Sequence, residues 1–100
     1  MKRFEIHNEA LAELDEAIEW YNQRRDGLGV ELHDEVSAAI AKVVADPGIG
    51  ARHGNSSYRF YRVMRFPYLV YYRDLPDMIW VAAIAHGRRR PNYWRRRKPP

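Results

Sequence analysis

The chain of 100 residues contains no cysteine and no long apolar segment. Without cysteine it has neither a disulfide framework nor a thiolate metal site, which fits a reducing compartment. Its N-terminal stretch lacks the apolar core of a signal peptide, and no apolar run approaches the roughly 18 residues of a membrane span. We therefore expect a soluble cytoplasmic protein, with room for one domain and one modest hydrophobic core.

Acidic residues are scarce in the second half of the chain. Residues 51–100 carry 12 Lys or Arg and only 2 Asp or Glu, whereas residues 1–50 carry 5 basic and 11 acidic residues. The formal net charge of +4 therefore hides an acidic half and a strongly basic half. A basic half of this density attracts polyanions or an acidic protein segment, although a solvated basic face without a ligand accounts for the charge equally well.

Motifs for metals and nucleotides are missing as well. The glycines of "GLG" (27–29) lack both a preceding strand and the further glycine or lysine of a phosphate-binding loop. Neither HExxH nor any other paired ligand spacing links the four histidines, which are His7, His33, His53 and His86. We predict no metal and no cofactor.

Apolar periodicity predicts two helices after a strand at 3–7. Asn8 is expected to cap the first helix, which should end near Arg25. Two glycines then reverse the chain, and Pro47 ends the second helix. The acids of "ELDEAIE" (13–19) are expected to face water. The first apolar stripe comprises Leu11, Leu14, Ile18 and Tyr21, and the second comprises Leu32, Val36, Ile40, Val43 and Val44.

The apolar period changes from helical to alternating after a predicted loop at 46–57. Aromatic and β-branched residues predict strands at 58–63, 68–73 and 78–86. The last is almost entirely apolar, which is typical of a central strand buried on both faces.

The predicted order is β-α-α-β-β-β, an α+β fold. An antiparallel helix hairpin should pack on a mainly antiparallel four-stranded sheet, because the apolar faces of the two helices need a sheet to cover them. We expect a single domain over residues 1–95, followed by a basic tail at 96–100 that ends in proline.

The strongest chemical constellation lies in the basic half. If adjacent strands present the same end, His86 and several arginines converge, and guanidinium groups bind phosphate bidentately. A histidine in such a cluster is a candidate for proton transfer, although a structural role at the strand end is the alternative. Aromatic side chains for stacking on nucleobases lie nearby in the sequence: Tyr58, Tyr61, Tyr93 and Trp94.

The chain resembles the RelE/ParE superfamily of toxins from type II toxin-antitoxin systems, and in particular its ParE-like or plasmid-stabilisation branch. The resemblance covers about residues 3–95 and rests on the order of the elements and on three segments: "ALAELDEAIEWYNQRRDGLGVELHDEVSAAIAKVVADP", "YRFYRVMRFPYLVYYR" and "IWVAAIAHGRRRPNYW". It implies the same α+β fold.

This resemblance implies two different targets. RelE-type toxins cleave mRNA in the ribosome without a metal, using basic residues and a tyrosine, whereas ParE-type toxins poison DNA gyrase. Arg59 and Arg89 match the nuclease pattern and Tyr93 matches it approximately, but Tyr61 and Leu69 stand where RNA-cleaving relatives carry basic residues. If the chain is an enzyme, the candidate catalytic residues are Arg59, His86, Arg89 and Tyr93.

The two missing charges remove stabilisation that a pentacovalent phosphate needs, so we expect ParE-like inhibition of DNA gyrase and replication. The first alternative is a ribosome-dependent, metal-independent mRNA endoribonuclease (an mRNA interferase). The second is a non-toxic protein of the toxin fold that only binds an antitoxin. The sequence leaves the target, the retention of toxicity and the oligomeric state open.

The gyrase inhibitor and the mRNA endoribonuclease, the two toxic hypotheses, both imply a complex with a cognate antitoxin. Its C-terminal segment should be acidic and amphipathic, and should fold on binding over the helix hairpin and the basic sheet face. Trp20 and Tyr21 are the candidate contacts for this segment. The candidate contacts for phosphate or for the target are Arg62, Arg65, Arg88 and Arg90; within the stretch "RFPYLVYY" (65–72), Arg65 is the residue expected to meet an anion.

Overall fold

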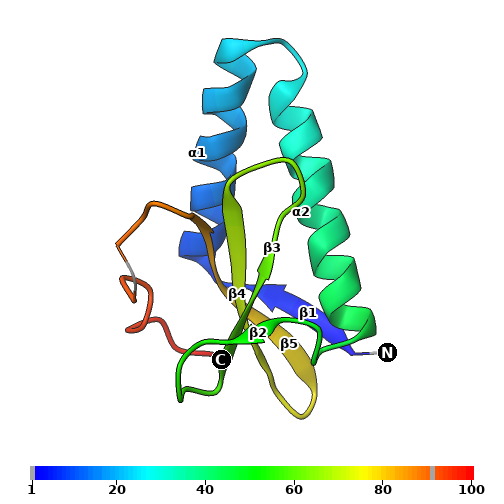
Figure 1. Ribbon diagram of the computed structural model, residues 1–100, viewed down its shortest axis with the longest axis vertical. Coiled ribbons are helices and arrows are strands. Elements are labelled where there is room, and N and C mark those ends of the chain that lie inside the picture. The colour runs from blue at the N-terminus through cyan, green and yellow to red at the C-terminus, as the bar shows by residue number, and fades with distance from the viewer. Residues whose placement is uncertain (1, 91) are drawn as a thin grey trace.

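The computed structural model describes residues 2–90 and 92–100 and has the predicted α+β architecture (Figure 1). Two helices cover one face of a sheet with the strand order β1-β5-β4-β3-β2. β1 runs parallel to β5, and the other pairs are antiparallel. The elements are β1 (Arg3–Ile6), α1 (Asn8–Arg24), α2 (Leu28–Ala45), β2 (Ala51–Arg52), β3 (Tyr58–Arg62), β4 (Tyr68–Asp74) and β5 (Met78–His86).

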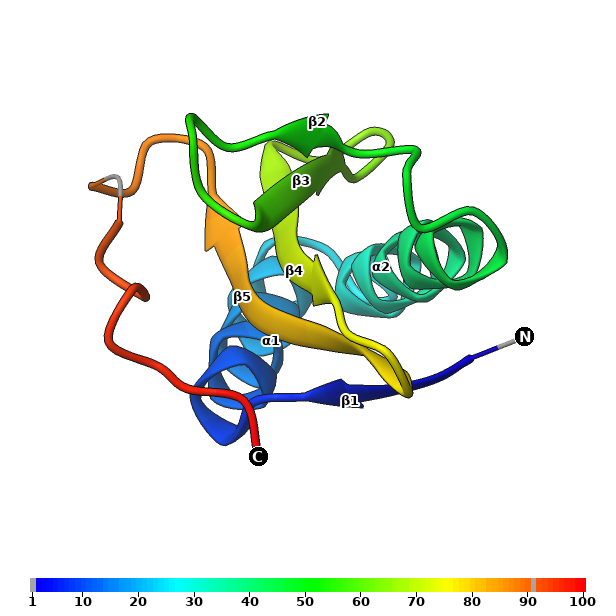
Figure 2. The ribbon, with the colours of Figure 1, turned by 90° about the horizontal axis from the view of Figure 1, so that it is seen from below.

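β5 is the central strand that its apolar sequence predicts. Every residue of β5 is buried except His86 at its end, because β1 and β4 flank its two edges and chain covers both faces. The helices lie on one face, and Trp94 of the C-terminal segment packs with Trp80 and Ala82 on the other. The C-terminal end of the chain lies close to α1 (Figure 2). The prediction of four strands missed only β2, a two-residue edge strand inside the segment expected to be a loop.

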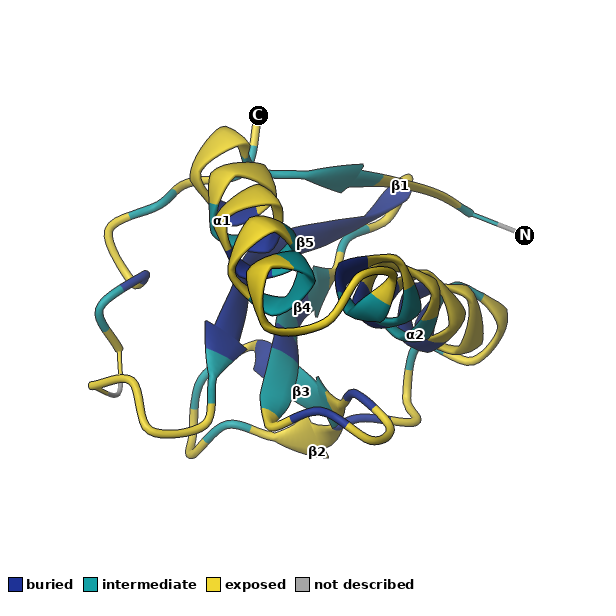
Figure 3. Cartoon of the chain, turned by 90° about the horizontal axis from the view of Figure 1, so that it is seen from above, coloured by how far each residue is buried: buried dark blue, intermediate teal, exposed yellow. Residues whose placement is uncertain are grey.

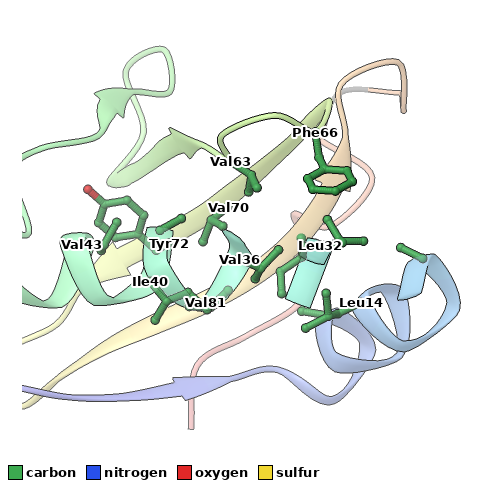
Figure 4. Packing of buried hydrophobic residues seen from close by; sticks show 14 of the residues in the cluster. Leu14, Leu32, Val36, Ile40, Val43, Val63, Phe66, Val70, Tyr72 and Val81 are labelled. Carbon is green, nitrogen blue, oxygen red and sulfur yellow. The ribbon is translucent and has the colours of Figure 1, made fainter. Parts of the chain in front are cut away.

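The core lies between the helices and the sheet (Figure 4). Leu32, Val36 and Ile40 of α2 are buried as predicted, and the outer faces of both helices are exposed (Figure 3). In α1, however, Leu11 is 42% exposed, so its assignment to the buried stripe was wrong. Ala10, Leu14 and Ala17 form the buried row instead, because the small alanine side chains let the helix lie close to β5.

Local side chains set the start of α1 and the turn between the helices. His7 caps α1 in place of Asn8, since its Nδ1 accepts the backbone N–H of Glu9 at 3.1 Å. At the turn, a Cβ on Gly29 would lie only 2.2 Å from the Ile18 carbonyl oxygen, and the Gly29 N–H donates to Asn22 Oδ1 at 2.7 Å. The close approach of the two helices therefore requires glycine at this position.

Tyr72 of β4 fastens the segment between α2 and β2. Its ring is fully buried, and its hydroxyl donates to the Pro47 carbonyl at 2.7 Å and accepts the Gly50 N–H at 3.0 Å. The hydroxyl thus satisfies two backbone groups of a segment that has no regular partner. No helix in the described part of the chain is long and apolar enough to cross a membrane.

Replacing Tyr72 by Phe should lower the free energy of unfolding by roughly 1–3 kcal/mol, because two backbone groups lose a buried partner. Tyr61→Phe is the matched control, since the Tyr61 hydroxyl makes no hydrogen bond within the described chain, and it should change little. Urea denaturation measures both variants. Equal stability of the two would show that the Tyr72 hydroxyl does not hold this segment.

Candidate functional site

A hollow of about 310 Å³ opens between α1 and the carboxyl end of β5. Three parts of the chain form its wall: one side of α1, the paired ends of β4 and β5, and the start of the C-terminal tail. We call it the α1–β5 hollow. Its lining comprises Glu13, Glu16, Ala17, Trp20, Tyr21, Tyr68, Ile84, Ala85, His86, Arg89 and Tyr93.

Aromatic contacts build the floor of this hollow. Tyr68 pairs with His86 across β4 and β5, and their rings meet edge to face at 5.3 Å. Tyr21 reaches from α1 to within 6.3 Å of the Tyr68 ring and 5.2 Å of the Phe66 ring. Trp20 lies at the rim, 49% exposed. The floor of the hollow is therefore an aromatic surface that contacts within the chain already hold in place.

The Glu13 carboxylate closes the hollow on its tail side. It accepts hydrogen bonds from the Tyr93 hydroxyl, from the Ile84 N–H at 3.2 Å, and from Arg97 Nη1 and Nη2 at 3.2 and 3.0 Å. The side chains of Glu13 and Arg97 are only 14% and 10% exposed. The prediction that Glu13 faces water was therefore wrong. Its spacing from Ala10 and Ala17, three and four residues, places it beside the buried row and was the available signal.

This carboxylate also completes the sheet. The last pair between β1 and β5 is Ile6↔Val81, so β5 continues past the end of its neighbour. Beyond that point the Ile84 N–H binds Glu13, and the Ala82 carbonyl accepts Arg97 Nη1 at 2.9 Å. The pair thus takes the place of strand partners along an edge that would otherwise be unsatisfied.

Tyr93 is held in its protonated form. Burial and the hydrogen bond to Glu13 raise the pKa of its hydroxyl far above the ordinary value for tyrosine. The Arg89 guanidinium lies 4.0 Å from the centroid of the Tyr93 ring. The Tyr93 hydroxyl is therefore engaged by Glu13, and one face of its ring by Arg89.

The structure brings three of the four candidate catalytic residues together and leaves the fourth apart. His86, Arg89 and Tyr93 line the α1–β5 hollow. Arg59 does not, because it pairs with Tyr72, four residues along β4 from Tyr68, or roughly 13 Å away along the strand. Its guanidinium donates to the Gly50 carbonyl at 2.8 Å.

The arginines predicted to contact phosphate or a target lie in three different settings. Arg65, in a turn with φ of 70°, binds Glu31 at 2.6 Å and Glu35 at 3.5 Å, so it already has carboxylate partners on α2. The Arg65 hydrogen bond is the main cause that lowers the pKa of Glu31. Arg62 is exposed at the end of β3, and Arg88 and Arg90 are exposed in the tail.

The aromatic residues expected to stack on bases are mostly occupied. Trp94 is 1% exposed and packs at 4.7 Å from the rings of both Tyr58 and Tyr71. Tyr58 is also buried, and Tyr61 packs against the core. Within residues 2–90 and 92–100, no group of three or more histidine or acidic side chains is placed to hold a metal ion.

A family model described as the ParE toxin of the type II toxin-antitoxin system, parDE, matches residues 4–91. The chain belongs to the ParE toxin family. A solved structure described as the chromosomal ParDE TA system from P. aeruginosa has the same fold, with a TM-score of 0.76 at 18% sequence identity. The match covers 86% of this chain and 96% of that one. No curated protein sequence matches the chain.

Membership of the ParE family confirms the branch that the resemblance indicated. This ParE-family toxin has the two-helix, mainly antiparallel architecture expected for it. The tail segment around Tyr93 and Arg97, which lies beyond the matched residues, is attached to the fold by Glu13.

Replacing Glu13 by Gln in this ParE-family toxin should lower the free energy of unfolding by about 3–5 kcal/mol, because Arg97 would lose the carboxylate of a mostly buried ion pair. The tryptophan emission should also shift to the red as Trp94 becomes exposed, and a Trp94→Phe variant identifies its share of the signal. Glu16→Gln is the control, since Glu16 lines the same hollow without an ion pair among the described residues. Chemical denaturation measures the free energy of unfolding of both variants. Equal values for the two would contradict a structural role for Glu13.

Proposed function

We propose that this ParE-family toxin inhibits DNA gyrase and does not cleave RNA. The observation that carries the proposal is the dispersal of the groups that RNA cleavage would need. Leu69 and Tyr61 stand at two positions where RNA-cleaving relatives carry basic residues, and Arg59 binds a backbone carbonyl far along the sheet from His86. A developing phosphorane would meet few fixed cations.

The proton-transfer groups support the same proposal. Metal-free cleavage needs a base and an acid within reach of the reacting oxygens. Tyr93 already donates its proton to Glu13, and burial opposes its ionisation. His86 has one ring nitrogen engaged, because Nδ1 accepts the Arg88 N–H at 3.0 Å. Tyr93 is therefore not free to act as the acid, and His86 offers only Nε2 for proton transfer.

We further propose that the α1–β5 hollow receives the C-terminal segment of a cognate antitoxin. An apolar side chain of that segment would enter between Trp20, Tyr21 and Tyr68, while its acidic residues would meet Arg89 and the exposed tail arginines. The solved structure of similar fold is described as a ParDE toxin-antitoxin system, which supports a paired partner here.

The ribonuclease alternative is favoured by one observation, the convergence of His86, Arg89 and Tyr93 in a single hollow. A site of that kind would use His86 for proton transfer and Arg89 for phosphate, in an arrangement different from that of the RelE-type enzymes.

Controlled expression in bacteria separates the two activities. We expect growth arrest with covalent gyrase–DNA complexes and an SOS response, while transcripts remain intact over the first minutes. Rapid mRNA cleavage that disappears in an Arg89→Ala variant would overturn the proposal in favour of the ribonuclease. Harmless accumulation of the free chain would instead favour the non-toxic binding protein.

Trp20→Ala should weaken binding of the antitoxin roughly tenfold or more, because a half-exposed tryptophan at the rim of a hollow is a typical anchor residue. Leu11→Ala is the control, since Leu11 is similarly exposed on the same helix but does not line the hollow. Calorimetric titration with the product of the neighbouring reading frame measures both. Equal losses would place the antitoxin elsewhere on the toxin.

A further inference from the structure

We propose that the C-terminal tail of this toxin is a binding surface for the phosphodiester backbone of a nucleic-acid duplex. We call it the tail surface. This inference concerns direct contact with nucleic acid and does not depend on the toxin's protein target. The surface consists of the exposed cations Arg88, Arg89, Arg90, Arg95, Arg96 and Lys98.

Three inward-facing residues fix the path of the tail. Trp94 is buried against Tyr58 and Tyr71. The Tyr93 hydroxyl binds Glu13, and Arg97 spans Glu13 and the Ala82 carbonyl. The segment is thus attached to α1 and to both layers of the fold. Figure 3 shows a buried point in this otherwise mostly exposed segment. An attached segment loses less conformational entropy on binding than a free arginine-rich chain would.

The other basic side chains of the tail surface are exposed and make no ion pair with an acidic side chain of the described chain. Within the described tail, Arg97 is the residue that makes ion pairs, with Glu13 at 3.0 Å and Glu9 at 3.5 Å. Arg96 and Lys98 line an open hollow of about 560 Å³ together with His7 and Arg89. The carboxylate that lines this hollow belongs to Glu9, which already forms an ion pair with Arg97. The hollow therefore keeps an excess of positive charge facing solvent.

The composition of this surface favours nucleic acid over a protein partner. Protein interfaces are built around a buried apolar centre, but none of the exposed large apolar side chains of the described chain lies in the tail; they are Phe4, Leu11, Trp20, Val30, Ile49 and Met64. Phosphate backbones need no such centre, because neutralisation of phosphates and release of counterions supply the binding free energy.

The occupied aromatics favour a duplex over a single strand. Proteins that bind single strands stack bases on exposed aromatic rings. Trp94 is buried, and Tyr93 is covered by Arg89 at 4.0 Å and Arg97 at 5.3 Å. The tail thus offers positive charge but no exposed aromatic ring on which a base could stack. Such a surface fits contact with the backbone of a duplex and predicts no preference for base sequence.

Fluorescence anisotropy with dye-labelled 20-bp duplexes tests this inference with the full chain. DNA and RNA duplexes of one sequence show which backbone binds better, and a single strand of equal charge serves as comparison. We expect duplex binding at least as tight as single-strand binding. The double variant Arg96→Ala/Lys98→Ala should bind roughly tenfold or more weakly at 0.1 M salt and reduce the salt slope by about 2.

The control is Lys42→Ala/Arg52→Ala, which removes the same charge from exposed positions on α2 and on β2 at the sheet edge opposite β1. It should stay within about twofold of the unmodified chain. Equal losses in the two double variants would overturn the proposal, because binding would then follow net charge alone. Equally tight binding of polyglutamate of matched charge would also overturn it and indicate an acidic protein segment. Tryptophan fluorescence, with a Trp94→Phe variant to identify the contribution of Trp94, checks that the tail of each variant stays docked.

Discussion

The hydrogen bonds of the Glu13 carboxylate are the interactions on which the packing of the C-terminal tail depends. This carboxylate accepts hydrogen bonds from β5, from Tyr93 and from Arg97, and so joins the first helix, the central strand and the C-terminal tail. A carboxylate with these partners is costly to bury and costly to disturb, since each donor would otherwise lie unsatisfied in a poorly hydrated place. The length of β5 creates the need, because β1 ends before β5 does.

The position of the tail follows from this contact. With the tail held beside α1, Arg89 and Tyr93 line the α1–β5 hollow, and they also line a second hollow together with the tail cations Arg96 and Lys98. One anchored segment therefore serves two surfaces of different character. The hollow is aromatic and suits a folded peptide, whereas the tail surface is cationic and suits phosphate.

The regular elements could be predicted from sequence because their periods are strong. The apolar run of β5 and the row through Leu32, Val36 and Ile40 allow few alternatives, and both lie where they were expected. The prediction of buried residues was wrong where two adjacent residues of a helix fitted the apolar pattern equally well. Leu11 and Ala10 fit neighbouring rows of one helix, and only the closeness of α1 to β5 selects the smaller residue.

The sequence by itself determined the fold class and the polarity of charge, since these depend on periodicity and composition along the whole chain, and its segments carry the resemblance to the toxin family. The tertiary structure alone decided how the polar groups are used. In the structure Glu13 is a largely buried hydrogen-bond acceptor and Trp94 is buried. Arg65 pairs with α2, and Arg59 lies far from His86. Such roles depend on neighbours distant in sequence, and no local pattern encodes those distances.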